Sequence, residues 1–507
     1  MTLRAISGMQ KCVTLLCCCL AITQLSMVAV AETVETQRSL TKALEGVSGA
    51  RMMADVGLLS SPEFNGRQTG TADDLRSSVF ITGRFSSFAP PASGPGFHPA
   101  AFRPTTVTHR VTTTHIGEEA LLELHFDLHS VTLQIGTHYL PILDSPSVRV
   151  VAPVVFVGYG ISDPARSFDE YERIDVRNRV VLFLRGKPEG YPLRVSHAAK
   201  VRVAREQGAT AFLTMTGPVR SAYETRRGIP AGPLAYYGST GADAGGPLPG
   251  AWISTVMGTT VLASRGRSLR AVQEELNRTL IPRSMETDVV ARLSWDSEKT
   301  SGILHNVYGL LPGSDPTVQE ETVLVGSHRD PFGRQAGVLF PGADDNASGT
   351  AVLLEVARAF ALTGVKPRRS ILFASFSGEE QGLLGSELYI SRPLRPLNKT
   401  VAMVNVDHVG VGNKRLTVGI AGLPKAVAVE AGQVAGLADK LDLYGFFPGG
   451  DHVPFKKAGV PTITIVSAGS HPHFHQPSDT ADTIQPEILE AVARYVLTLT
   501  WHLANRS

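Results

Sequence analysis

The run Ile-Leu-Phe-Ala-Ser-Phe at Ile371–Phe376 leads directly into Ser-Gly-Glu-Glu-Gln-Gly-Leu-Leu-Gly-Ser at Ser377–Ser386. The first run is apolar and predicts a buried strand. The adjacent carboxylates of Glu379 and Glu380 follow it almost at once. Two neighbouring side chains cannot easily do the same job, so one can bind a metal while the other takes a proton from a water on that metal. Metal-assisted hydrolysis needs this division of labour.

The section from about residue 291 to the end alternates strand-like and helical patterns. Its strand-like runs are Thr322–Gly326, Ser370–Ser375, Val401–Val406 and Thr462–Val466. Between the first two, Gly349–Leu362 carries apolar side chains at helical spacing. This alternation predicts an α/β fold with a mixed, mainly parallel sheet covered by helices on both faces. In such sheets the chemistry gathers at the carboxyl ends of the strands.

Residue types that bind metals stand just past those strands. They are His328, Asp345, Glu380, Asp407 and His475. Each alone has an ordinary explanation as a helix cap or a turn residue, but five at successive strand ends indicate a site. Two imidazoles and three carboxylates suit zinc, and their charge suits two divalent ions with a bridging hydroxide. Asp330, two residues after His328, is a candidate to orient that imidazole.

Five motifs taken together resemble the co-catalytic zinc exopeptidases of the secreted bacterial leucyl aminopeptidase and aminopeptidase Y type. They are His-x-Asp at 328–330, Asp-Asn-Ala-Ser-Gly at 345–349, Gly-Glu-Glu-x-Gly-Leu-x-Gly-Ser at 378–386, Asn-x-Asp at 405–407 and His-x-x-x-Asp-Thr at 475–480. The resemblance implies a zinc exopeptidase fold, two zinc ions per chain, and hydrolysis of N-terminal residues from peptide substrates.

The resemblance also implies a role for each residue of the site. Asp345, rather than Asp344, would bridge the two ions, because the bridging residue stands four before the glycine of the Ser-Gly pair. Glu379 would be the general base that moves a proton from the water to the leaving amine. The other ligands would be His328 and Asp407 on one zinc, and Glu380 and His475 on the other.

Three further residues are candidates for the substrate pocket: His452, Phe474 and His473. Some relatives place a tyrosine immediately before the last metal histidine, where its hydroxyl can steady the oxyanion. Phe474 stands there in this chain and cannot donate a hydrogen bond. The zinc ions, His471 or His473 would then have to stabilise the oxyanion. His452, in Gly-Asp-His-Val-Pro-Phe, matches a stretch near the pocket in relatives.

The nearest alternative is a metallo-carboxypeptidase or dipeptidase of the same fold. A carboxypeptidase should hold a terminal carboxylate with an arginine, and Arg329 and Arg334 are the candidates, whereas an aminopeptidase should hold an amine with carboxylates. The spacing before Asp345 favours the aminopeptidase. A glutaminyl cyclase needs one zinc, so the presence of His328 and Asp407 argues against it. A non-catalytic, receptor-like binding protein is a lesser alternative and would be expected to have lost ligands.

We expect four parts along the chain. They are a signal peptide at 1–31, an N-terminal part of the peptidase domain at 32–147, an inserted section at 148–290, and the catalytic zinc peptidase domain at 291–507. The inserted section resembles a protease-associated domain through Val-Phe-Val-Gly-Tyr-Gly at 155–160. It lacks a His/Asp/Glu cluster at ligand spacing, and residues 217–250 are rich in Gly, Pro and Ala. We expect these residues to form a flap that shapes access, and expect that trimming it leaves the zinc content intact.

Residues 1–31 have the features of an export signal. Arg4 and Lys11 precede the apolar run Cys12–Leu20, and Ala29-Val30-Ala31 supplies a small-x-small cleavage pattern. This predicts a secreted or periplasmic protein without stable membrane insertion after cleavage, an uncleaved anchor helix being the alternative. All 4 cysteines lie in this segment, so the mature chain would have neither disulfides nor thiolate ligands. The 48 basic and 46 acidic side chains nearly balance, which gives no reason to expect nucleic acid as a partner.

Overall fold

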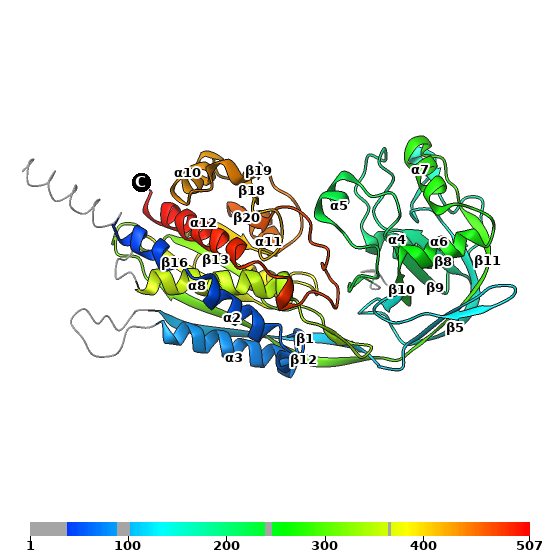
Figure 1. The fold of residues 1–507 in the computed structure, drawn as a ribbon, viewed down its shortest axis with the longest axis horizontal. Coiled ribbons are helices and arrows are strands. Elements are labelled where there is room, and N and C mark those ends of the chain that lie inside the picture. The colour runs from blue at the N-terminus through cyan, green and yellow to red at the C-terminus, as the bar shows by residue number, and fades with distance from the viewer. Residues whose placement is uncertain (1–37, 89–101, 239–245, 363–366, 507) are drawn as a thin grey trace, which may run out of the picture.

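The computed structural model describes residues 38–88, 102–238, 246–362 and 367–506. Within these ranges the chain forms two lobes, each built on an eight-stranded sheet (Figure 1). The expected export signal at residues 1–31 lies outside the described ranges. Among the described helices, none is both long and apolar enough to cross a membrane.

The sheet of the first lobe contains the strands predicted from the α/β pattern. In spatial order it consists of β1 (Arg103–Ile116), β12 (Ser297–Leu311), β16 (Ser370–Phe376), β13 (Thr322–His328), β17 (Thr400–Val406), β20 (Thr462–Ser467), β18 (Leu416–Ala421) and β19 (Leu441–Tyr444). The four central strands β16, β13, β17 and β20 run parallel to one another. Antiparallel pairing occurs at β1–β12, β12–β16 and β20–β18. The sheet is therefore mixed and mainly parallel, as predicted.

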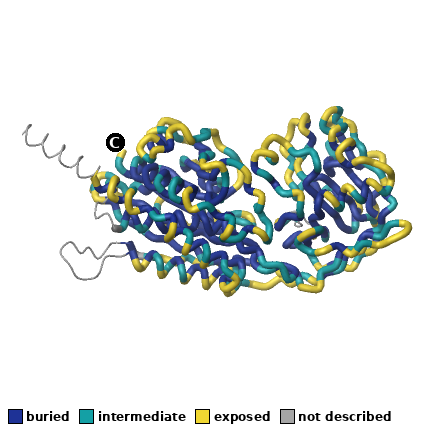
Figure 2. The backbone as a smooth tube through the Cα atoms, in the orientation of Figure 1, coloured by how far each residue is buried: buried dark blue, intermediate teal, exposed yellow. Residues whose placement is uncertain are grey.

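Helices cover both faces of this sheet, because successive side chains of its central strands alternate between two apolar layers. Val323 and Val325 of β13 pack into the large core that also holds α2, α3, α8, α10 and α12. Leu324, between them, packs on the opposite face with Tyr389 of α9 and Phe455 of α11. Figure 2 shows the resulting buried band through the lobe. The helices are α2 (Gly49–Leu59), α3 (Ala72–Ser87), α8 (Gly349–Leu362), α9 (Leu384–Ser391), α10 (Ala426–Val434), α11 (His452–Lys457) and α12 (Pro486–Asn505).

The second lobe has its own mixed sheet and core. Its strands, in spatial order, are β3 (Ser130–Thr132), β2 (Leu121–His125), β11 (Met285–Trp295), β5 (Val148–Phe156), β8 (Val180–Leu184), β9 (Ala211–Met215), β10 (Gly250–Ile253) and β4 (Tyr139–Pro141). Its helices are α4 (His197–Glu206), α5 (Ala222–Arg227), α6 (Thr255–Ala263) and α7 (Leu269–Thr279).

A two-stranded ribbon joins the lobes. Strands β1 and β12 pair from Arg103 opposite Leu310 to Ile116 opposite Ser297, so the chain leaves and re-enters the first lobe along this ribbon (Figure 1). The second lobe is thus an insertion of residues 117–296. It begins earlier than the expected boundary at residue 148, because β2, β3 and β4 join its sheet. A short antiparallel strand carries no mark of which sheet it will join.

Short hairpins and helical turns connect the larger elements. They are β6 (Ser162–Asp163) with β7 (Phe168–Asp169), β14 (Gly333–Gln335) with β15 (Val338–Phe340), and the turns η1 (Pro62–Phe64), η2 (Pro164–Arg166), η3 (Ala343–Ser348), η4 (Leu397–Lys399), η5 (Ala438–Lys440) and η6 (Ala481–Thr483). The turn η3 matters most for function, because it leads from the β14–β15 hairpin into α8 and carries Asp345.

Candidate metal centre and substrate cavity

The five predicted metal ligands come together at one edge of the first sheet. His328 is the last residue of β13, Asp407 follows β17 directly, and Glu380 lies shortly after β16. His475 lies in the loop after β20, and Asp345 lies in η3 ahead of α8. Strands β16, β13, β17 and β20 are parallel neighbours, so their carboxyl ends meet at this edge.

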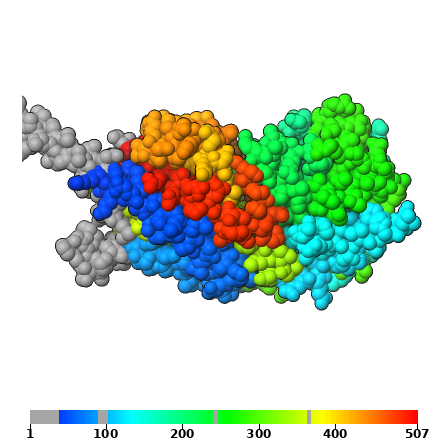
Figure 3. Space-filling view, in the orientation of Figure 1, coloured from blue at the N-terminus to red at the C-terminus, as the bar shows by residue number. Residues whose placement is uncertain are grey.

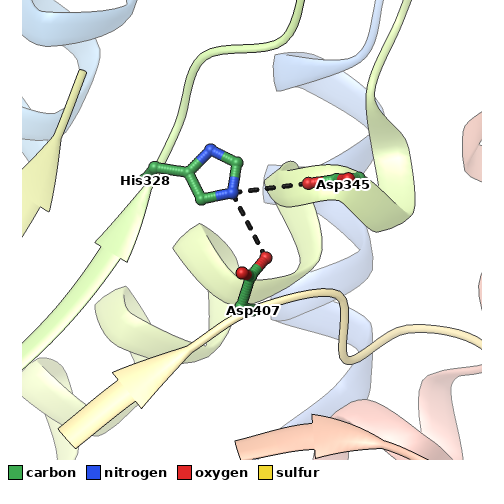
Figure 4. Close-up of side chains that lie close together, drawn as sticks. All are labelled: His328, Asp345 and Asp407. Carbon is green, nitrogen blue, oxygen red and sulfur yellow. Dashed lines mark hydrogen bonds and ion pairs between the residues drawn. The ribbon is translucent and has the colours of Figure 1, made fainter. Parts of the chain in front are cut away.

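These side chains form two groups of potential ligands that share Asp345. In the first group, His328 Nε2 lies 3.3 Å from Asp345 Oδ1 and 3.2 Å from Asp407 Oδ1 (Figure 4). In the second, His475 Nε2 lies 3.4 Å from Asp345 Oδ2 and 3.4 Å from Glu380 Oε1. Each carboxylate oxygen of Asp345 therefore faces a different histidine, as a residue that bridges two ions must.

Hydrogen bonds to main-chain oxygens fix both imidazoles. His328 Nδ1 contacts the carbonyl of Asp330 at 3.1 Å, and His475 Nδ1 contacts the carbonyl of Ala235 at 2.9 Å. A donor at Nδ1 leaves Nε2 as the lone-pair nitrogen, and Nε2 faces the carboxylates in both cases. The carboxylate of Asp330 is 3.7 Å from His328 Nδ1 and accepts hydrogen bonds from the main-chain N–H groups of Glu379 and Glu380, both 3.3 Å away. Asp330 therefore positions His328 through its carbonyl and the Glu379–Glu380 turn through its side chain.

The electrostatics of the site fit a cation. Burial lowers the pKa of His328, but neighbouring carboxylates, Asp407 first, outweigh it and raise that pKa well above its ordinary value. Burial of His475 is likewise outweighed by Glu380 and Asp345, which raise its pKa to about 10. A divalent ion can replace these protons and neutralise the same negative charge. The donor set of two imidazoles and three carboxylates fits zinc.

Glu379 lies beside the ligands and belongs to neither group. Its side chain lines the cavity that holds the ligand residues. Burial, with a further contribution from the negative charge of Glu380, raises the pKa of Glu379 well above its ordinary value. A carboxylate with a raised pKa is a stronger proton acceptor, which suits a general base near neutral pH.

Asp344 differs from Asp345 in its surroundings. Its carboxylate accepts a hydrogen bond from the main-chain N–H of Gly410 at 2.7 Å and lies 2.5 Å from His471 Nδ1. His471 Nε2 in turn lies 3.0 Å from the carbonyl of Ser467. Asp344 and His471 therefore use each other and the main chain as partners. Asp345 turns its oxygens to His328 and His475, and its assignment as the bridging residue stays a prediction.

The candidate ligands line a cavity of about 650 Å³ whose lining is partly acidic and partly apolar. Its apolar wall includes Phe446, Phe447, Val466 and Phe474. Helix α5 of the second lobe adds Tyr223, Arg226 and Arg227 to the lining. A second cavity, of about 770 Å³, also reaches Glu379 and Glu380 and is lined in part by Tyr236–Gly238 of the second lobe.

The candidate pocket residues lie in different places. Phe474 lines the cavity and stacks on the ring of His475, with 3.8 Å between centroids. His452 lies behind the wall, with Nε2 2.9 Å from the carbonyl of Phe447. His473 contacts Ser478 Oγ at 2.9 Å and is not part of either cavity wall that the described residues form. His473 and the buried His471 are thus poorly placed to steady an oxyanion.

The two arginines considered for a carboxypeptidase do not reach the cavity. Arg329 is fully buried and pairs with Asp74 at 2.5 Å. Arg334 contacts Asn65 Oδ1 at 3.3 Å and the carbonyl of Gly337 at 2.9 Å. The arginines that line the cavity, Arg226 and Arg227, instead come from the second lobe.

Three residues close to the candidate ligands were not predicted from the sequence. His408 follows Asp407, and its Nε2 lies 3.6 Å from Asp407 Oδ1. Its position at a strand end, next to the predicted ligand Asp407, could have marked it as a residue of the site. Arg227 Nη2 contacts His408 Nδ1 at 2.5 Å, and Ala235 supplies the carbonyl that holds His475. These two lie in the second lobe, and nothing in their local sequence marks them as neighbours of a metal site.

The fold is that of zinc-dependent aminopeptidases. An aminopeptidase from Aneurinibacillus sp. strain AM-1 superposes with a TM-score of 0.64 at 22% identity, over 92% of this chain and 97% of that one. A zinc aminopeptidase from Bacillus subtilis superposes with a TM-score of 0.62 at 20% identity, over 91% and 96% of the two chains. At these identities the likeness establishes the fold.

Sequence comparison finds a family match over part of the chain. Residues 306–500 match the profile of peptidase family M28. A probable leucine aminopeptidase from Arthroderma otae is 30% identical over 215 residues, which are 39% of this chain and 57% of that relative. The matched region thus spans little more than half the length of that curated relative. The predicted resemblance to the zinc exopeptidases is confirmed, whereas the protease-associated assignment of the second lobe stays a prediction.

Proposed function

We propose that this protein is a metallo-aminopeptidase that removes N-terminal residues from peptides. In this proposal His328 and Asp407 would hold one zinc ion, Glu380 and His475 would hold the other, and Asp345 would be shared between them. The observation that carries the proposal is the pair of ligand groups sharing Asp345, with one carboxylate oxygen toward each histidine. The similarity to a probable leucine aminopeptidase, together with the match of residues 306–500 to peptidase family M28, supports the same activity.

Bound in these groups, zinc supplies Lewis acidity: it lowers the pKa of water and polarises the scissile carbonyl. Glu379 accepts a proton from the attacking water at its carboxylate and returns it to the leaving amine. The hydrogen bonds from the Glu379 and Glu380 main chain to Asp330 hold the two carboxylates in separate positions. Glu380 can then serve as a ligand while Glu379 stays available to move the proton.

The cavity fits a peptide with a free N-terminus. Its acidic part, which includes Asp407 and Glu379, attracts the α-ammonium group, while Phe446, Phe447 and Val466 offer an apolar surface to the first side chain. We therefore expect a preference for large apolar N-terminal residues. Export, as expected from residues 1–31, belongs to the same proposal.

A second candidate, cleavage of dipeptides and other very short peptides, is favoured by Arg226. Its guanidinium lies 5.7 Å from the ring centroid of Tyr444 at the cavity, and it forms no ion pair with a carboxylate among the described residues. An arginine that is not paired with a carboxylate there can receive the C-terminal carboxylate of a short substrate. This reading keeps the same metal chemistry and changes only the length of the substrate.

One set of matched peptides tests both candidates. Leucyl peptides would be offered with a free or acetylated N-terminus, and with a free or amidated C-terminus. We expect acetylation to slow cleavage strongly, because it removes the basic amine and adds bulk beside Glu379 and Asp407. Amidation should matter little for the aminopeptidase and should raise KM for the dipeptidase. Cleavage that needs a free C-terminus and tolerates acetylation would move the assignment to a carboxypeptidase.

A further inference from the structure

The second lobe contacts one ligand group of the metal centre directly and reaches the other through His408. One contact is made by residues 231–238, which we call the strap, and the other by Arg227 of α5. In the space-filling view the second lobe lies directly against the C-terminal part of the first (Figure 3). Neither contact belongs to the ribbon that connects the lobes.

The strap holds His475. The carbonyl of Ala235 lies 2.9 Å from His475 Nδ1, and the N–H of Ala235 donates to the carbonyl of His475 at 3.0 Å. The side chain of Gln476 donates to the carbonyl of Pro233. The strap therefore contacts both the ring and the main chain of a metal ligand.

Other hydrogen bonds fix the strap to the body of the second lobe. The N–H of Thr255 donates to the carbonyl of Ala231 at 2.8 Å, and the N–H of Leu143 donates to the carbonyl of Tyr236 at 2.9 Å. The backbone of His475 has a φ of 55°, a left-handed conformation that is unfavourable for a residue other than glycine. Such a conformation persists where its surroundings hold it, and the reciprocal pair with Ala235 is a surrounding of that kind.

Arg227 acts on the other ligand group through His408. Its Nη2 lies 2.5 Å from His408 Nδ1, and its Nη1 donates to the carbonyl of Ser467 at 3.1 Å. His408 Nε2 then lies 3.6 Å from Asp407 Oδ1. The guanidinium is a donor only, so His408 accepts at Nδ1 and presents its Nε2 hydrogen to the ligand carboxylate.

Helix α5 is itself well anchored. Ser221 and Glu224 form a capping box at its start, and Glu224 also pairs with Arg185 of the second lobe at 2.6 Å. Arg227 is buried, whereas its neighbour Arg226 is exposed. A movement of the second lobe would therefore be transmitted to His408 through Arg227.

We infer that the second lobe is a structural part of the metal centre: the strap positions His475, Arg227 positions Asp407 through His408, and both raise zinc affinity. The inference rests on the metal centre proposed above. It replaces the expectation that residues 217–250 form a flap whose loss leaves zinc binding intact. Arg227 and the strap are positioning groups that contact ligands or their neighbours.

The first test uses two adjacent arginines of the full-length protein. Arg227→Ala should weaken zinc binding ten- to a hundredfold, the usual effect of removing a group that orients a ligand, when measured by competition with a chromophoric chelator. The matched control, Arg226→Ala, loses the same side chain from the same helix and should keep wild-type zinc affinity. Glu380→Gln should leave only the zinc position of His328 and Asp407. Adding Arg227→Ala to this variant should weaken the remaining zinc binding, which would assign the loss of affinity to that position.

Chemical rescue separates positioning from a general loss of folding. Guanidinium at low millimolar concentration can enter the space left by Arg227→Ala, which borders the cavity, and should restore part of the zinc affinity. If Arg227→Ala does not fold, Arg227→Lys decides the question. It keeps the charge but reaches only one of the two acceptors, so its zinc affinity should fall between those of the wild type and a full loss.

The second test addresses the strap. Gln476→Ala removes the hydrogen bond to Pro233 and should weaken zinc at the Glu380–His475 position. Ser478→Ala, in the same loop, removes only the contact with His473 and should keep wild-type affinity. Wild-type zinc affinity in both Arg227→Ala and Gln476→Ala would overturn the inference. So would an equal loss of affinity at both zinc positions that guanidinium does not restore. If the wild-type protein bound no zinc, the proposed metal centre itself would be refuted, and this outcome is distinct from failure of the inference about the second lobe.

Discussion

Changing Glu379 to glutamine should abolish most turnover and leave the metal centre intact. The substitution keeps the shape of the side chain and the main-chain hydrogen bond to Asp330, but an amide cannot accept the proton. The other carboxylates lining the 650 Å³ cavity are Asp345, Glu380 and Asp407, and all three belong to the ligand groups. No spare carboxylate is therefore available among the described lining residues. We expect kcat to fall about 10²–10⁴-fold, or about 3–5 kcal/mol in the barrier, with a loss near the upper end.

The assay compares Glu379→Gln with Glu380→Gln in one preparation. Turnover of a leucyl peptide and zinc content by elemental analysis would be measured on both dialysed proteins. Glu379→Gln should retain two zinc ions per chain, whereas Glu380→Gln should lose one, because Glu380 belongs to the group of His475. A Glu379→Gln variant within tenfold of wild-type turnover would refute the assignment of the base. Loss of zinc from it would place Glu379 among the ligands instead.

Two further predictions concern the metal and the second lobe. Removal of zinc by a chelator should abolish turnover, and return of zinc should restore it. Removal should also speed hydrogen exchange at Ala235, because the N–H of that residue donates to the carbonyl of His475. Unchanged exchange would mean that the strap does not respond to the metal. Burial lowers the pKa of His197, whose ring packs against Phe212 and Trp252, to about 3. The stability that neutral His197 contributes is therefore present above its unfolded pKa of about 6.5 and is lost as the pH falls toward 3, by about 1.4 kcal/mol per pH unit. Denaturant unfolding followed by tryptophan fluorescence should show this dependence in the wild type and a smaller one in His197→Leu.

The sequence was most informative where side-chain chemistry and strand periodicity coincide. The runs before His328, Glu379 and Asp407 predicted parallel strands, and the parallel order brings their ends together. Helix α8 begins and ends where the apolar spacing placed it, at Gly349 and Leu362. A buried parallel strand must be apolar throughout, so a polar residue at its end stands out. The five candidate ligands stand out in the sequence for this reason.

The sequence was least informative where the main chain makes the contact. Ala235 holds His475 with its carbonyl and N–H, groups that every residue except proline carries, so its identity reveals nothing. The start of the second lobe was also placed too late, since β2 pairs with β11, more than 150 residues further along the chain. Such pairings depend on the whole topology rather than on local pattern.

The contacts with Ala235 and Arg227 also give the second lobe a thermodynamic role. If docking of the lobe raises zinc affinity ten- to a hundredfold, zinc must favour docking by the same factor, because coupling between two binding events is reciprocal. That factor corresponds to about 1.4–2.7 kcal/mol. The ribbon of β1 and β12 keeps the lobe near the site in either state, so it cannot by itself create this coupling. The coupling must come from the strap and Arg227, the two places where the lobe contacts ligands or their neighbours. A lobe that reads as a separable insertion can thus help to keep the metal centre assembled, and zinc can help to keep the walls of the substrate cavity in place.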